Sequence, residues 1–277
     1  MLRKRLRGTH AKCAACFVCD DTVCGSKGAG VIRSVIFDLG GTLLNFDGAA
    51  QDWRGLEGRG ISTFHRFLAE RGCVVPESKF EQAMWDTIRL SWQAAMAGRD
   101  NARLPEMLGV AAASFGISLS DGERTLAARL YASGVESDLA PFEGGREMLR
   151  ALRQRNLRIG LLSNTAWPGE FHKQELERFG LIEFFDEMVF SCELGAWKPN
   201  ASAFHHVAER LGVAPAEAVY VGDLPEIDIL GAQQAGLRAV WMAALPRNLG
   251  QVKPDAVIRH LRELPSALDR LEKPVLS

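Results

Sequence analysis

Polar residues follow the apolar runs of this sequence at the points where strands would end. Asp38 closes one run, Ser163 and Asn164 close a second, Asp223 closes a third, and Lys198 follows a fourth by a short loop. Ligands of an open α/β sheet bind at the carboxyl ends of its strands. Each of these residues alone is also a common turn or cap residue. Together they supply a nucleophile, a hydroxyl, a lysine and a carboxylate suited to a metal, which indicates a catalytic site.

The runs that position these residues are short and almost continuously apolar, as in strands that are covered on both faces. We predict strands at 34–39, 158–163, 187–191, 218–223 and 238–242, and helices at 145–155, 171–179, 201–211 and 226–235. Gly180, Gly212 and Gly236 stand just past three of these helices, where a left-handed cap needs a residue without Cβ. The alternation of strand and helix predicts an α/β fold with a doubly wound, parallel, Rossmann-like sheet.

The stretch from about residue 48 to 140 interrupts this alternation with helical patterns only, at 58–71, 78–97, 104–115 and 120–133. We therefore predict a helical cap subdomain at 48–140, inserted into a core made of 31–47 and 141–277. Trp85 and Trp92 are seven residues apart in one of these helices. That spacing is more typical of a packed stripe than of a substrate platform.

The composition is that of a folded globular protein, with 47% hydrophobic and 24% charged residues. The formal net charge of -1 gives no basic field, so neither nucleic acid nor an anionic membrane is expected as a partner. No apolar run approaches the roughly 20 residues that span a bilayer, and no apolar stretch of signal-peptide length follows the basic start. We expect a cytoplasmic protein, and its oligomeric state stays open.

Residues 1–30 are basic and glycine-rich, and they carry Cys13, Cys16, Cys19 and Cys24. Thiolates this close together could hold zinc or an iron–sulfur cluster. Their spacing, however, fits neither the zinc-ribbon nor the ferredoxin pattern well. We predict a disordered tail and leave open whether it binds a metal or belongs to the working protein.

Four segments resemble, in order and spacing, the four motifs of the haloacid dehalogenase-like hydrolases. They are FDLGGTL at 37–43, LLSNT at 161–165, the pair Lys198-Pro199, and VGDLPEID at 221–228. The resemblance covers about 31–242 and is specific for the superfamily, but much less so for the substrate. The helical block between the first two motifs resembles the C1 type of cap.

The resemblance implies a Mg²⁺-dependent phosphohydrolase that acts on a small phosphorylated metabolite, since a cap over the site leaves little room for a macromolecule. Asp38 would attack phosphorus and form an acyl phosphate, which splits one hard step into two easier ones. Asp38, the main-chain carbonyl of Gly40 and Asp223 would bind Mg²⁺, which prefers oxygen ligands and keeps several waters. Asp228 would bind a metal water or orient Lys198.

The residues expected to bind substrate are Gly41, Thr42, Arg54, Ser163 and Asn164. The Ser163 hydroxyl and the amide of Asn164 would donate to phosphoryl oxygens. Lys198 would stabilise both the phosphate and the Asp38 intermediate. Gly41 lets the backbone turn sharply beside the ligand. Arg54, where the chain leaves for the cap, would touch an anionic leaving group or lie on the surface.

Position 40 departs from the family pattern, in which phosphatases carry a general acid–base Asp two residues after the nucleophile. Such help contributes roughly 10²–10⁴-fold, so Gly40 leaves the enzyme slow or redirects its chemistry. A haloacid dehalogenase is one alternative, although it needs no Mg²⁺ and would waste the Asp223–Asp228 pair. A phosphonate hydrolase is another, and it needs a cap lysine, for which Lys79 is the one candidate. A non-catalytic binding protein is the third.

Overall fold

The computed structural model describes residues 30–45, 53–134 and 139–272. The predicted tail and its cysteine cluster lie outside the described residues apart from Gly30, so the expected disorder and metal binding stay predictions. No helix in the described part of the chain is long and apolar enough to cross a membrane.

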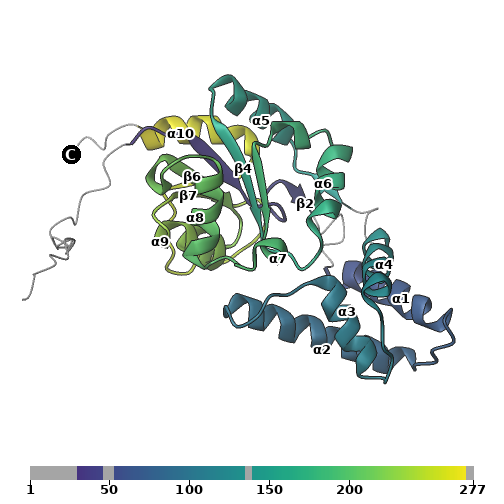
Figure 1. Cartoon of the computed structure of the whole chain (residues 1–277). Coiled ribbons are helices and arrows are strands. Elements are labelled where there is room, and N and C mark those ends of the chain that lie inside the picture. Colours follow the sequence, from purple (N-terminus) through teal and green to yellow (C-terminus); the bar gives the residue numbers. More distant parts are fainter. Residues whose placement is uncertain (1–29, 46–52, 135–138, 273–277) are drawn as a thin grey trace, which may run out of the picture.

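Six parallel strands form the central sheet, in the order β5-β4-β1-β6-β7-β8 (Figure 1). The strands are β1 (Ser34–Phe37), β4 (Arg158–Ser163), β5 (Glu187–Phe190), β6 (Ala218–Gly222), β7 (Arg238–Met242) and β8 (Ala256–Ile258). The five strands predicted from the apolar runs are confirmed. β8 was not predicted, because a three-residue edge strand is too short to carry a recognisable pattern.

The middle of the sheet is β1, which pairs with β4 on one side and with β6 on the other. Successive strands therefore extend the sheet in opposite directions from β1. The point where the direction reverses is a topological switch point, and ligands of open α/β sheets bind there at the carboxyl ends of the strands. The predicted doubly wound α/β fold is confirmed.

Helices cover both faces of the sheet. One face carries α5 (Gly145–Gln154), α6 (Gly169–Arg178) and α10 (Leu264–Glu272), and the other carries α8 (Ala201–Arg210) and α9 (Gly231–Gln234). Alternate strand residues point to opposite faces, so Val35 and Phe37 of β1 belong to the first core and Ile36 to the second. Both faces of β1 are thus apolar, which is why its sequence is a continuous apolar run.

Glycines in the left-handed conformation follow three of the helices, as predicted from the sequence. Gly180, Gly212 and Gly236 have φ of 63°, 67° and 86°, in the left-handed region that residues with Cβ rarely adopt. Each glycine is the second residue past the end of its helix.

Residues 53–133 form four helices, which we call the helical unit: α1 (Trp53–Ala69), α2 (Glu77–Met96), α3 (Leu104–Ala113) and α4 (Asp121–Ser133). The four helices share one core, which also includes Ala166, Trp167, Phe171 and Trp197 of the sheet domain. Trp85 and Trp92 pack against this core as the predicted stripe. Two short strands that the sequence did not predict, β2 (Leu44–Asn45) and β3 (Ala140–Pro141), pair antiparallel where the chain enters and leaves this part of the molecule.

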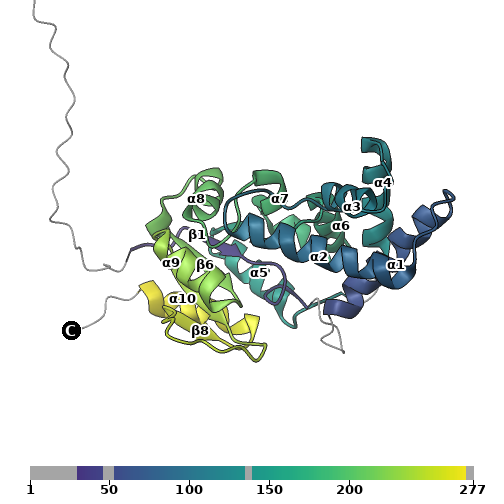
Figure 2. The same ribbon diagram turned by 90° about the horizontal axis from the view of Figure 1, so that it is seen from below.

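The helical unit meets the sheet domain at the loops that follow β4 and β5. Both views show α2 running toward the sheet domain with its C-terminal end (Figures 1 and 2). Asn101, between α2 and α3, donates through Nδ2 to the carbonyl of Cys192 (2.7 Å) and accepts from Trp197 Nε1 (2.9 Å). The amide of Leu104 donates to the carbonyl of Ala166 (2.7 Å). These contacts hold the end of α2 beside the carboxyl edge of the sheet.

A carboxyl group is buried inside the helical unit. Glu57 of α1 is 4% exposed, and the Tyr131 hydroxyl of α4 donates to its Oε2. Burial raises the pKa of Glu57 from 4.5 to about 7, although the hydrogen bond from Tyr131 lowers it. Between these two pH values the folded state binds more protons than the unfolded state. Glu57 therefore makes the protein less stable as the pH rises through this window.

We expect Glu57→Gln to remove this pH dependence, because the amide keeps an acceptor for Tyr131 without carrying a charge. The variant should match the wild type near pH 4.5 and exceed its free energy of unfolding by up to ~3 kcal/mol at pH 8.5. Urea unfolding at both pH values measures the difference. Glu77→Gln, at an exposed glutamate of α2, is the control and should behave as the wild type. An equal effect of Glu57→Gln at both pH values would contradict the raised pKa.

Candidate active site

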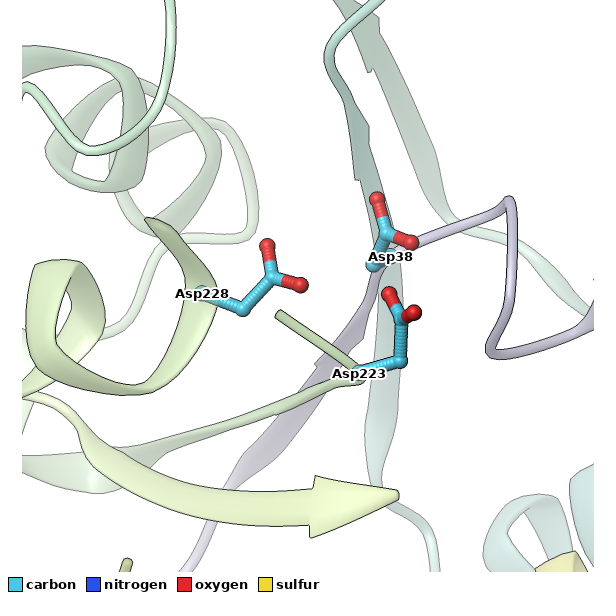
Figure 3. A group of neighbouring side chains, drawn as sticks. All are labelled: Asp38, Asp223 and Asp228. Carbon is cyan, nitrogen blue, oxygen red and sulfur yellow. The ribbon is translucent and has the colours of Figure 1, made fainter. Parts of the chain in front are cut away.

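Three carboxylates converge at the carboxyl edge of the sheet, at the switch point. Asp38 directly follows β1, Asp223 directly follows β6, and Asp228 lies in the next helical turn. All three side chains are buried, and one oxygen from each lies within 4.8 Å of the other two (Figure 3). The sheet thus brings together carboxylates that are far apart in the sequence.

The turn that carries Asp228 is a π-helical turn, Pro225–Leu230, followed by α9, where the sequence predicted one helix over 226–235. Pro225, the first residue of the turn, has no N–H to donate. The residue before it, Leu224, donates its main-chain N–H to the Asp228 carboxylate (2.9 Å). A Cβ at Gly222 would lie only 2.5 Å from Asp228 Cβ, so the missing side chain there lets the turn approach β6. Single π turns of this kind are frequent at functional sites.

Lys198 is the cation that holds two of the carboxylates. Its Nζ donates to Asp38 Oδ1 (2.6 Å), to Asp228 Oδ1 (2.8 Å) and to the Tyr220 hydroxyl (2.7 Å), so all three ammonium protons are used. The Tyr220 hydroxyl donates in turn to the carbonyl of Leu162 (3.0 Å). Asp228 therefore orients Lys198 toward Asp38 in this structure.

Asn164 fixes the main chain of Lys198. Its Oδ1 accepts from the Lys198 amide (2.9 Å), and its Nδ2 donates to the Lys198 carbonyl (2.9 Å). The peptide bond between Lys198 and Pro199 is cis. The side-chain amide of Asn164 is therefore used inside the protein, on the lysine rather than on a ligand.

Arg247, in the loop after β7, belongs to the site and was missed by the sequence analysis. Its Nε and Nη2 lie 2.9 Å and 2.8 Å from Asp223 Oδ2. Trp241 of β7 supports the same residue by donating from Nε1 to the Asp223 carbonyl (2.9 Å). A signal was available, because Arg247 follows the predicted strand at 238–242 by five residues and so lies at the same edge of the sheet.

With all three carboxylates ionised, the site would carry one net negative charge against the two cations Lys198 and Arg247. Burial raises the pKa of Asp38 to about 7, and the neighbouring carboxylates add to the rise while Lys198 opposes it. Burial and Asp228 raise the pKa of Asp223 to about 6 against the effect of Arg247. Burial lowers the pKa of Lys198, but Asp228 and Asp38 outweigh it and the net shift is upward. A further positive charge would therefore be stabilised here.

The donor set fits a divalent cation. Oδ1 of Asp223 is buried and has no hydrogen-bond partner among the described residues, and a buried acceptor of this kind requires a donor or an ion. Oxygens of Asp38 and Asp223 lie within 4.8 Å of each other, and Gly40 follows Asp38 by two residues. Carboxylate and carbonyl oxygens are the ligands that hard cations such as Mg²⁺ prefer.

A cavity of about 570 Å³ opens over these residues, a size typical of small-ligand sites. Asp38, Gly41, Ser163 and Lys198 contribute to its polar lining. Six further lining residues are apolar, and we call them the apolar wall: Trp92, Met96, Trp167, Leu224, Ile227 and Leu245. They come from α2, from the loop after β4, from the segment after Asp223 and from the loop after β7. The helical unit and the sheet domain therefore enclose the cavity together.

Three of the five residues expected to bind substrate, Gly41, Ser163 and Asn164, line this cavity. Thr42 lies in the same turn but is completely buried and is not part of the lining. Arg54 belongs to α1, and its side chain lies outside the described part of the chain. Tyr220 was missed, although a tyrosine in an aliphatic strand is a signal, because its buried hydroxyl needs a partner.

Gly41 is required for both its conformation and its lack of a side chain. Its φ is +79°, and a Cβ there would lie 2.5 Å from Asp223 Oδ2. We expect Gly41→Ala to displace the Asp223 carboxylate and to lower kcat/KM by roughly 100-fold, the usual cost of a shift of about 1 Å in a catalytic group. Gly212→Ala is the matched control, since Gly212 has a similar φ of +67° with no atom near its would-be Cβ. Steady-state kinetics of both variants measure the effect, and equal losses would contradict it.

Comparison with known proteins gives a family. Residues 32–236 match the sequence profile described as haloacid dehalogenase-like hydrolase. The glyceraldehyde 3-phosphate phosphatase of Methanopyrus kandleri is 38% identical over 141 residues, which are 49% of this chain and 59% of that protein. The N-acylneuraminate-9-phosphatase of Rattus norvegicus is 26% identical over 264 residues, which are 87% of this chain and 95% of that protein. The chain spans about half the length of several other curated relatives that it matches.

Solved structures share the fold over most of the chain. A 2-haloacid dehalogenase from Pseudomonas syringae pv. Tomato superimposes with a TM-score of 0.65 at 26% identity, covering 87% of this chain and 99% of that one. A HAD phosphatase from Thermococcus onnurineus gives a TM-score of 0.61 at 24% identity, covering 86% and 98%. The predicted family is therefore confirmed, and this chain belongs to the haloacid dehalogenase-like hydrolases.

Proposed function

We propose that the protein is a Mg²⁺-dependent phosphohydrolase that releases phosphate from a small phosphorylated metabolite through an aspartyl phosphate on Asp38. The observation that carries the proposal is the position of the Lys198 ammonium, which is hydrogen-bonded to both Asp38 and Asp228. Asp223 lies beside these two carboxylates, and Asp38 and Lys198 line the cavity. Relatives named as glyceraldehyde 3-phosphate and phosphoserine phosphatases support the same reaction class.

In the proposed reaction, a carboxylate oxygen of Asp38 attacks phosphorus, and the bond from phosphorus to the leaving oxygen breaks. Lys198 stabilises the negative charge on the phosphoryl oxygens and keeps Asp38 in its reactive orientation. Position 40 carries no side chain, so the leaving oxygen takes its proton from water. A second water then attacks phosphorus and gives a proton to the hydroxide that the first water left. The bond from phosphorus to the Asp38 oxygen breaks, and inorganic phosphate leaves with the carboxylate restored.

Asp38, Asp223 and the carbonyl of Gly40 would hold the Mg²⁺, with Asp228 acting through a metal water or through Lys198. When bound, the ion supplies positive charge that lets an anionic phosphate approach an anionic nucleophile. Gly41, Ser163 and the main-chain amide of Asn164 would contact the phosphoryl group directly, since all three residues line the cavity. Thr42 and Arg54 stay proposed substrate contacts from the sequence alone.

We further propose that the helical unit is a C1-type cap, with the chain divided into a core of 31–47 and 141–277 and a cap of 48–140. Trp92 and Met96 of α2 line the same cavity as Asp38, which supports this division. A cap that closes over substrate excludes bulk water during attack on phosphorus.

Among the alternatives, a haloacid dehalogenase has one specific observation in its favour, the structural similarity to the Pseudomonas enzyme. The triad of Asp38, Asp223 and Asp228 instead favours metal-dependent chemistry. Phosphonate cleavage through Lys79 is disfavoured by its position. Lys79 is exposed in the first turn of α2, 17 residues before Met96, which is roughly 25 Å along the helix axis.

Phosphate release from a broad panel of phosphorylated metabolites, with Mg²⁺ and again with EDTA, tests the proposal. We expect release that is at least roughly 100-fold slower in EDTA and returns when Mg²⁺ is added in excess. Halide release from 2-bromopropionate is the parallel arm. Halide release that EDTA leaves unchanged, with no phosphate from any compound, would replace the phosphohydrolase by a dehalogenase.

A further inference from the structure

The polar side chains that line the cavity away from Asp38 are already bonded inside the protein. Thr165 Oγ1 accepts from the Trp167 amide (3.0 Å) and lies 2.8 Å from His172 Nε2. His172 Nδ1 lies 3.5 Å from Glu175 Oε2. Thr165, His172 and Glu175 are all buried. This hydroxyl and this imidazole therefore bond to each other rather than to a bound molecule.

The same holds for most of the remaining polar side chains. Nε and Nη2 of Arg247 lie against Asp223 Oδ2. The side-chain amide of Asn164 is bonded to Lys198 on both sides, and its Nδ2 also lies 3.4 Å from Met96 Sδ. Among the described lining residues away from Asp38, the surface left to meet a leaving alcohol is therefore mainly that of the apolar wall, beside Nη1 of Arg247.

The two tryptophans of the apolar wall are held in place by other rings. Trp92 meets Trp197 edge-on with ring centroids 4.9 Å apart. Trp167 stacks on His172 at 6.2 Å and meets Tyr131 edge-on at 6.0 Å. An apolar ligand would therefore find ordered aromatic surfaces, so little side-chain freedom would be lost on binding.

We infer that the leaving-group part of the cavity binds an apolar, ring-bearing alcohol, so that the preferred substrates are phosphate monoesters of such alcohols and not of sugars or other polyols. This inference rests on the proposed phosphohydrolase function. Moving a phenyl ring from water onto the apolar wall should increase the affinity by roughly 10- to 100-fold. The hydroxyl groups of a polyol would instead lose their hydrogen bonds to water without finding new ones.

The first experiment compares phosphate esters whose leaving alcohols have similar reactivity and different polarity. 2-Phenylethyl phosphate, glucose 6-phosphate and sn-glycerol 3-phosphate are all esters of unactivated primary alcohols. We expect kcat/KM for the phenylethyl ester to exceed the other two by roughly 10- to 100-fold. A higher kcat/KM for either polyol ester would overturn the inference even though the phosphohydrolase function stood.

Variants locate the preference in the apolar wall. Trp92→Ala should lower the preference for the phenylethyl ester by roughly tenfold, chiefly through KM. Trp85→Ala is the matched control, because Trp85 packs on the same core from the same helix and does not line the cavity. Met96→Gln places polar atoms in the wall, on a side chain of similar length. It tests the preference for the phenylethyl ester a second time if Trp92→Ala folds poorly. Equal effects of Trp85→Ala and Trp92→Ala would contradict the assignment.

A binding measurement separates this inference from the proposed reaction. Calorimetry of the wild-type protein with Mg²⁺ compares 2-phenylethylphosphonate with methylphosphonate, neither of which can transfer its phosphoryl group by P–O cleavage. We expect the phenylethyl compound to bind roughly 10- to 100-fold more tightly, whether or not any ester is hydrolysed. Equal dissociation constants would overturn the apolar site. Absence of hydrolysis with unequal dissociation constants would overturn the reaction and keep the apolar site.

Discussion

Asp38→Asn is expected to lower phosphate release by roughly 10⁴-fold or more, the usual effect of removing a covalent nucleophile. The amide cannot form the acyl phosphate, but it is almost the same size as the carboxylate and can still accept the hydrogen bond from Lys198 Nζ. Asp38 is a carboxylate that burial disfavours, with its pKa raised to about 7. As for Glu57, a neutral amide at this position should therefore not lower the free energy of unfolding, and it should raise it at pH values above 7.

Three measurements check this result. Steady-state kinetics give the loss of activity, urea unfolding shows whether the fold is kept, and mass spectrometry after acid quenching shows whether a phosphorylated Asp38 peptide forms only in the wild type. Asp269→Asn, at an exposed aspartate of α10, is the control for the chemical change itself. A folded Asp38→Asn protein with near-normal turnover would remove Asp38 from the role of nucleophile.

Lys198→Met is expected to damage both stability and activity. Lys198 is 1% exposed and is hydrogen-bonded to two buried carboxylates, so its removal leaves negative charges buried without a cation. Breaking a buried pair in this way costs about 3–5 kcal/mol, and losing a positive charge at the phosphoryl oxygens costs roughly 10²–10³ in kcat.

The stability loss should depend on pH in a defined direction. At pH 8.5 Asp38 and Asp223 are ionised and repel one another most strongly. At pH 5.5 both can take up a proton, because their pKa values are already raised to about 7 and about 6. We therefore expect a larger loss at the higher pH, measured by urea unfolding beside Lys253→Met, a change at an exposed lysine. A pH-independent loss would argue against charge repulsion as its cause.

Much of the fold was predictable because its signals are local. The continuous apolar runs of β4 and β7 were predicted with their observed bounds, since strands covered on both faces need apolar residues at every position. The glycines after three helices were predicted from the steric rule for left-handed residues. The prediction was wrong where no local signal exists, as at the three-residue edge strand β8. One regular helix was predicted over 226–235, whereas the structure has a π turn that carries Asp228 followed by a short α-helix.

The sequence by itself determined which residues could do chemistry, because Asp38, Ser163 and Asp223 stand at strand ends that every parallel sheet gathers at one edge. Only the tertiary structure decided their partners. Arg247 reaches Asp223 across 24 positions, Tyr220 reaches Lys198 across 22, and Asn164 reaches Lys198 across 34. Crossover connections and loop conformations create these pairs, and no local pattern encodes them.

The apolar wall likewise exists only in the folded protein. The spacing of Trp85 and Trp92 predicted packing, which both residues show, yet only Trp92 also faces the cavity. The reason is geometric: the contacts of Asn101 and Leu104 with the loops after β4 and β5 place the end of α2, and not its beginning, beside the carboxyl edge of the sheet. A helical pattern specifies which face of a helix is apolar, whereas the docking of that helix decides what the face meets.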